Sequence, residues 1–192
     1  MAAPAYISGS IAWKVWGSTG STSTLTLSAY AVPAGTDKLL VVISHSEDSG
    51  IGDVAGGATF GGTAMTERAR IQTNSDKNAL VLYTHPLGAT TPTGDIVVTS
   101  AGAGIRDWRI GAIVISGADQ SAAPISATAL GLTYNITTTS VDNLLITAYG
   151  SSSTGAITAD PADTLIDTSI GGGDPTEAAV AYRVAATAQA YS

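Results

Sequence analysis

The sequence contains no cysteine, a single phenylalanine and few charged side chains. The absence of cysteine excludes disulfide bonds, thiolate nucleophiles and thiolate metal sites. Charged residues make up 12% of the 192 residues, against roughly 25% in an ordinary domain. No apolar run approaches the ~18 residues that a membrane-spanning helix needs. Residues 1–6 lack the basic and apolar regions of a secretory signal peptide, so we expect no such signal.

Basic residues are scarce in the second half of the chain. Residues 110–192 hold Arg183 as their single basic side chain against seven acidic ones, and so carry −6 of the net charge of −7. Nucleic-acid binding depends on Lys and Arg side chains that neutralise phosphates, and binding to anionic lipid has the same requirement. We therefore expect no nucleic-acid partner and no membrane partner.

What the chain does have is 44% hydrophobic residues and 22 glycines. This composition is typical of a folded domain with a core, and not of a disordered or collagen-like chain. A chain of 192 residues without a low-complexity linker predicts one domain. We expect a single domain over residues 1–192, in which residues 1–20 form an N-terminal arm or an edge strand.

Apolar and polar residues alternate along most of the chain, as they do in half-buried β-strands. Residues 22–28 alternate hydroxyl and apolar side chains. Further runs of strand length and β-branched or aromatic composition lie at residues 39–44, 79–84, 95–99, 110–115, 144–149 and 178–184. Turns rich in glycine and proline separate these runs. The pattern predicts an all-β fold: a jelly-roll-like antiparallel β-sandwich.

Two of the expected strands begin in the same way. Residues 35–40 and 140–145 both place an aspartate, then Lys or Asn, before a Leu-Leu pair. The likeness has two interpretations, a turn-to-strand device used twice or a true internal repeat.

His45 and Glu47 stand two positions apart at the end of an apolar run, so on a strand both side chains project from one face. A carboxylate beside an imidazole can orient it for metal binding or base catalysis. A zinc site needs three or four ligands, however, and no second histidine lies at a suitable spacing. The alternative is that the two residues belong to a polar loop at the end of the strand and have no catalytic or metal-binding role. His85, which precedes Pro86, is expected to be structural.

Aspartates cluster at two places that raise the question of calcium. Asp160, Asp163 and Asp167 lie within one short segment, and Asp48 and Asp53 flank another. Calcium takes about six to eight oxygen ligands, and neither segment matches an EF-hand loop or a glycine-rich nonapeptide repeat. The alternative is that each carboxylate caps its own turn. We expect no cofactor, and keep loop-bound calcium at residues 160, 163 and 167 as a hypothesis.

Tryptophans raise the question of sugar binding. Trp13 and Trp16 are three positions apart, so on a strand they face opposite sides and cannot form one stacking surface. Trp108, between Arg106 and Arg109, could stack on a pyranose if it is exposed, or seal the edge of the core if it is buried.

Three turn-and-strand segments follow one another along the chain: residues 32–42 (VPAGTDKLLVV), 58–66 (ATFGGTAMT) and 112–121 (AIVISGADQS). With residues 142–145 (DNLL) and 181–184 (AYRV), they resemble a family of β-sandwich proteins found among virion proteins of tailed phages and in phage-derived regions of bacterial genomes. Each of these motifs builds a turn and a strand, and none carries catalytic residues.

The resemblance implies a non-enzymatic virion protein, either a capsid decoration subunit or a head- or tail-associated fibre. It implies phage capsid or tail proteins as partners, assembly into a homo-oligomer such as a trimer, and a place in the virion after synthesis in the bacterial cytoplasm. The alternative is a carbohydrate-binding module or adhesin that recognises a cell-surface glycan through Trp108. A third interpretation, a glycan hydrolase, needs two carboxylates across a cleft.

Overall fold

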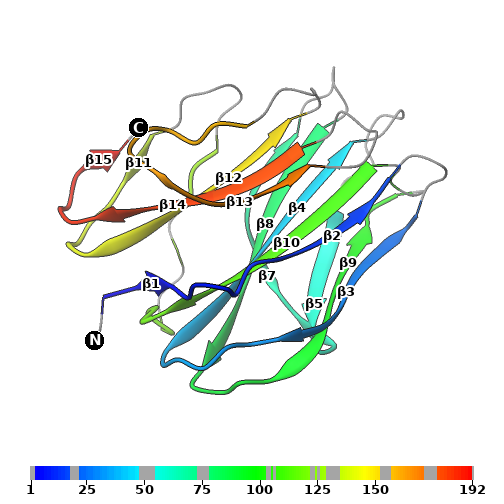
Figure 1. Cartoon of the computed structure of the whole chain (residues 1–192), viewed down its shortest axis with the longest axis horizontal. Helices are drawn as coiled ribbons and strands as arrows, with labels where there is room; N and C mark the ends of the chain where they lie inside the picture. Colours follow the sequence, from blue (N-terminus) through cyan, green and yellow to red (C-terminus); the bar gives the residue numbers. More distant parts are fainter. Residues whose placement is uncertain are drawn as a thin grey trace.

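The protein is built from β-strands (Figure 1). The computed structural model describes residues 3–17, 22–47, 55–72, 78–102, 105, 107–121, 124, 126–128, 135–151, 157–170 and 177–191. No helix occurs among these residues, and thus none that is long and apolar enough to cross a membrane.

The largest sheet, which we call the central sheet, is antiparallel and runs in the order β1-β10-β4-β8-β7, with β2 also paired to β10. Its strands are β1 (Ala5–Tyr6), β2 (Ala12–Trp16), β4 (Lys38–Glu47), β7 (Thr66–Gln72), β8 (Asn78–Gly88) and β10 (Asp107–Ser116). The N-terminal strands β1 and β2 therefore lie side by side with β10 at one edge of this sheet.

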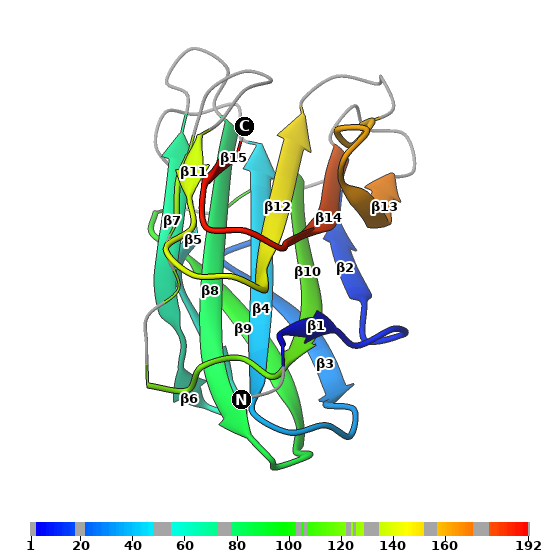
Figure 2. The same cartoon turned by 90° about the vertical axis from the view of Figure 1, so that its left-hand side faces the viewer.

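Two further sheets pack against the central sheet, one on each face (Figures 1 and 2). The first outer sheet consists of β3 (Thr24–Ala31), β9 (Thr93–Ser100), β5 (Ala55–Phe60) and β6 (Thr63–Ala64), in that order. The second outer sheet consists of β12 (Asn143–Ser151), β14 (Glu177–Ala185) and β13 (Thr164–Ile170). A short pair, β11 (Ile136–Thr137) with β15 (Ala190–Tyr191), completes the described strands.

The central sheet is buried on both faces because its strands carry apolar residues at consecutive positions. On β4, Leu40 and Val42 belong to the core shared with the first outer sheet, whereas Val41 and Ile43 belong to the core shared with the second. Side chains alternate between the two faces of a strand, so an unbroken apolar run is what a strand between two layers requires. The same alternation on β10 places Trp108 and Ile110 in the first core and Ile113 in the second.

The prediction of an all-β antiparallel fold is confirmed, and each expected run lies within or largely overlaps an observed strand. The strand order does not establish a jelly roll, and the third layer was not predicted. Strand β7 was also missed: its sequence, TERARIQ, carries three charged side chains, and it lies at the edge of the central sheet. Charges are frequent on edge strands because they discourage pairing with another chain.

Turns occur where the sequence places glycine and aspartate between the expected strands. Gly61 and Gly62 both have positive φ, 53° and 81°, as a tight turn between β5 and β6 requires. Asp37 and Asp142, the equivalent aspartates of the two similar segments, have φ values of 48° and 55°, a left-handed conformation that Asp tolerates better than most residues. The two similar segments therefore share the same kind of turn, one leading into β4 and the other into β12.

Candidate functional site

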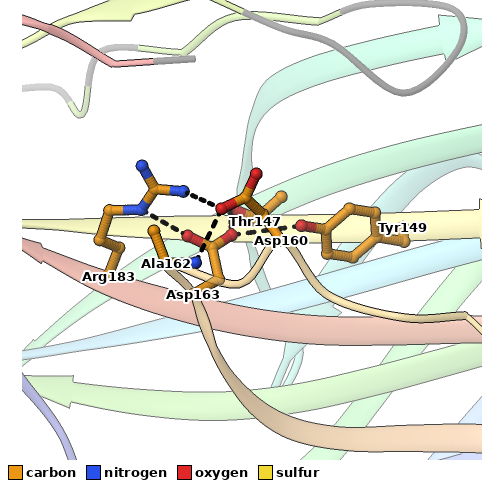
Figure 3. A network of polar contacts seen from close by, with 6 residues as sticks. All are labelled: Thr147, Tyr149, Asp160, Ala162, Asp163 and Arg183. Carbon is orange, nitrogen blue, oxygen red and sulfur yellow. Dashed lines mark hydrogen bonds and ion pairs between the residues drawn. The ribbon is translucent and has the colours of Figure 1, made fainter.

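The most extensive polar contacts of the second outer sheet surround Asp163, which precedes β13 (Figure 3). Its Oδ1 atom accepts a hydrogen bond of 2.6 Å from Nε of Arg183 on β14. Its Oδ2 atom accepts bonds of 3.2 Å from the hydroxyls of Thr147 and Tyr149 on β12. The Asp163 side chain has no exposed surface. One buried carboxylate thus joins the start of β13 to both other strands of its sheet.

Asp160 extends this arrangement toward solvent. Its Oδ1 atom accepts bonds from Nη2 of Arg183, at 3.0 Å, and from the backbone N–H of Ala162, at 2.8 Å. The second bond is the aspartate turn that was the alternative to calcium. About half of the Asp160 side chain is exposed, so its ion pair with Arg183 is screened by water.

Asp167 belongs to another place. It lies on β13 opposite Val180, and its Oδ2 atom accepts a 3.2 Å hydrogen bond from Nε1 of Trp13 on β2. This bond links the edge of the second outer sheet to the edge of the central sheet.

The structure does not bring the three aspartates of the calcium hypothesis together. The guanidinium of Arg183 binds both Asp160 and Asp163, and so neutralises these carboxylates in place of a metal ion. Asp167 contacts Trp13 instead. No cluster of metal-ligating side chains forms among the residues that the structure describes. Asp48 and Asp53 lie outside the described residues.

We therefore predict that calcium does not stabilise the protein. Adding millimolar calcium, or removing it with EDTA, is expected to leave the thermal unfolding midpoint unchanged, because a ligand raises stability only if it binds the folded state. Differential scanning calorimetry of the same preparation in the two buffers measures this. A midpoint that falls in EDTA and recovers with calcium would contradict the prediction.

Trp108 is buried, as expected if it packs in the core and does not stack on a sugar. Its ring has no exposed surface and lies in the core between the central and first outer sheets. Its Nε1 atom donates a 2.8 Å hydrogen bond to Oγ of Ser44 on β4. The sugar-stacking role of Trp108 is therefore wrong, because a pyranose cannot reach either face of this ring. Arg106 lies outside the described residues.

His45 and Glu47 do project from one face of β4, toward the second outer sheet, but they form no hydrogen-bonded pair. His45 is 1% exposed, and its Nδ1 atom has no hydrogen-bond partner. The residue opposite it on β10 is Arg109, which is equally buried. Burial, together with the positive charge of Arg109, lowers the pKa of His45 to about 3. The imidazole is therefore neutral near pH 7 and sealed from solvent, as a packing residue is.

The second outer sheet approaches His45 closely because β12 has a glycine there. A Cβ atom built on Gly150 would overlap the imidazole ring of His45. Gly111 on β10 makes the same kind of room for the ring of Trp13. Both glycines are thus required by side chains that lie flat on the backbone at these points.

We predict that Gly150→Ala lowers the free energy of unfolding by about 1–3 kcal/mol, because the added methyl group forces His45 or β12 to move. Urea unfolding followed by tryptophan fluorescence measures the loss. Gly57→Ala is the matched control: a Cβ at this strand position would meet its nearest neighbour, Oγ1 of Thr99, at an ordinary 3.8 Å. Equal stability of the Gly150→Ala variant and the unaltered protein would refute the close packing.

The remaining sequence motifs form structural contacts. Oδ1 of Asp119 accepts bonds from the N–H and hydroxyl of Ser121, while Oε1 of Gln120 accepts one from the N–H of Gly88 at the end of β8. Nζ of buried Lys38 donates to the carbonyl of Pro33, closing the turn before β4. His85 packs its ring edge-on against Phe60, with ring centres 6.0 Å apart.

Sequence reasoning missed the partners of the aspartates. Arg183 was noticed as the only basic residue of an acidic half, and that isolation was a signal that it neutralises carboxylates. Nothing in the sequence indicated which ones, because Arg183 lies twenty residues beyond Asp163. Arg109 was taken as a neighbour of Trp108, whereas alternation along β10 places it on the opposite face, beside His45.

Strands β2 and β13 lie on the same side of the molecule, which we call the β2–β13 side (Figure 2), and both carry large apolar side chains that reach solvent. Val15 and Trp16 of β2 and Leu165 of β13 are each 39–43% exposed. Among the described strands, β2 pairs only with β10 and β13 only with β14, so both are edge strands. The Trp13–Asp167 hydrogen bond holds these two edges together.

Comparisons with known proteins give no relative: no family model, curated protein or solved structure matches this chain.

Proposed function

We propose that this protein is a non-enzymatic structural subunit of a phage particle, either a capsid decoration protein or a head- or tail-associated fibre subunit. In this role it packs against the particle and against copies of itself in the virion. The motifs quoted above, which resemble tailed-phage β-sandwich proteins, support the particle as its setting.

The observation that carries the proposal is the β2–β13 side. Native proteins usually cover or blunt sheet edges, because unpaired backbone groups recruit further strands. Here two edges lie together and expose Val15, Trp16 and Leu165. Aromatic side chains such as tryptophan are enriched at the centres of protein interfaces. A second copy or a neighbouring particle protein would bury these side chains and satisfy the edges.

The first test is self-association of the purified chain. Sedimentation velocity over a hundredfold range of concentration is expected to show a homo-oligomer, a trimer being one candidate. Trp16→Lys and Leu165→Lys are each expected to weaken association at least tenfold by placing a charge in the contact. Val141→Lys is the matched control, since Val141 is an exposed apolar residue before β12, at the opposite edge of the second outer sheet from β13.

The second test is binding to a particle. A major capsid or tail gene is expected beside the gene for this protein, and particles assembled from that neighbour are expected to co-sediment with the chain. Particles that do not retain it, together with a chain that stays monomeric at every concentration, would overturn the proposal.

A further inference from the structure

A groove of about 800 Å³ lies over the β7–β8 part of the central sheet, on the side of the second outer sheet. Its floor is made mainly of side chains from β7 and β8, with Leu39 and Val41 of β4 and Ile115 of β10 beside them, and its wall of side chains from β12. The apolar residues from β7, β8 and β12 include Ala69, Ile71, Leu80, Leu82, Leu144 and Ile146. This volume falls in the range of about 300–1,000 Å³ that is usual for small-molecule sites.

The groove exists because the two layers differ in width. The second outer sheet has three strands, and β12, its edge strand, packs over β8. No strand of that sheet covers β7, as Figure 2 shows. The far side is lined instead by residues 126–128 and 136–143. Several of these carry hydroxyl groups, so an apolar floor meets a polar rim.

One cation stands at this rim. A register shift in the pairing of β7 with β8, between Glu67 and Ala69, makes Arg68 the extra residue of a bulge. Its Nε atom donates a 2.8 Å hydrogen bond to Oγ1 of Thr84, which also lines the groove. Bulges commonly re-aim a side chain in this way.

Arg68 differs from its neighbour Arg70. Arg70 forms an ion pair of 2.7 Å with Glu67, whereas none of the carboxylates that the structure describes forms an ion pair with Arg68. Asp119 and Asp142 also line the groove. Oδ1 of Asp119, however, is held by Ser121, and Asp142 occupies the left-handed turn before β12.

From this geometry we propose that the groove binds an aliphatic carboxylate. The hydrocarbon chain lies on Leu80, Leu82 and Ile146, where its burial drives binding. The carboxylate pairs with the guanidinium of Arg68, whose planar donors match a carboxylate well. The site is separate from the β2–β13 side, so this proposal stands or falls independently of the particle role.

The test uses the full chain and sodium dodecanoate, below its micelle concentration, in isothermal titration calorimetry. We expect saturable binding of one molecule per chain, and at least tenfold weaker binding of dodecanol, which lacks the charge. Arg68→Gln is expected to weaken dodecanoate binding about tenfold or more and to leave dodecanol binding unchanged. Arg70→Gln, two positions away on the same strand, is the matched control and is expected to bind like the unaltered protein.

A second variant locates the site. Ala69→Phe fills the groove from its floor without removing a core side chain, and is expected to abolish binding of both ligands while the thermal unfolding midpoint is kept. The absence of saturable dodecanoate binding to the unaltered protein would overturn the proposal. So would binding that survives Ala69→Phe, or equal affinity for dodecanoate and dodecanol that Arg68→Gln does not change.

Discussion

Replacing Asp163 with alanine is expected to lower the free energy of unfolding by about 3–5 kcal/mol, the usual cost of removing one member of a buried ion pair. The loss is large because Asp163 is fully buried and both of its oxygens are used. Without it, the guanidinium of Arg183 loses its shortest contact, and the hydroxyls of Thr147 and Tyr149 lose an acceptor. Total stability of small domains is about 5–15 kcal/mol, so the change is readily measured by urea unfolding.

Two further variants make this test specific. Asp160→Ala removes the exposed partner of the same arginine and is expected to cost at most about 1 kcal/mol. Asp163→Asn keeps the shape and one acceptor, and serves if the alanine variant does not fold. Equal losses for Asp160→Ala and Asp163→Ala would show that burial does not decide the strength of these contacts.

The second large effect concerns pH. The pKa of His45 is about 3 in the folded protein and 6.5 in the unfolded chain. As the pH falls below 6.5, the unfolded chain takes up a proton that the folded protein cannot, so stability is lost as the pH falls toward 3. The loss between pH 7 and pH 4 is expected to be about 3 kcal/mol from this residue alone. Urea unfolding at the two pH values measures it.

Other groups near His45 also titrate, so the comparison is made between variants. Glu47 faces the same side of β4 as His45, and Asp107 pairs with Glu47 on β10. Arg109, opposite His45 on β10, carries a positive charge that lowers the pKa of His45. His45→Gln is expected to remove the His45 share of the pH dependence. Val41→Ala, in the same interface, is expected to lower stability equally at both pH values. If His45→Gln keeps the full pH dependence, the carboxylates are its source.

Most of the long strands were predictable because they obey a local pattern. Val41 and Ile43 lie in an apolar run that any β-strand between two layers would carry, and the run was recognised as a strand. Because the apolar residues of this run are consecutive, the run also indicated burial on both faces of the strand. Which elements would cover those faces depends on pairings between β4, β10 and β14, and these join residues far apart in the chain.

The site residues were less predictable than the strands. Alternation correctly placed His45 and Glu47 on one face, yet the glycine that packs on the ring, Gly150, lies more than a hundred positions away. The aspartates at 160 and 163 were recognised as a cluster, but their partner is an arginine and not a metal ion. Local spacing determines which side chains share a face, whereas the partner across the layer is set by tertiary packing.

The three layers are held together unequally. Among the described residues, nineteen buried and three partly buried hydrophobic residues form the cluster between the central and first outer sheets. Five buried and ten partly buried ones form the cluster beneath the second outer sheet. Because the free energy of local opening follows the apolar surface released, separation of β12, β13 and β14 requires less energy than separation of the other layers. We therefore expect the second outer sheet to separate first when the molecule opens locally, while the central and first outer sheets stay packed together.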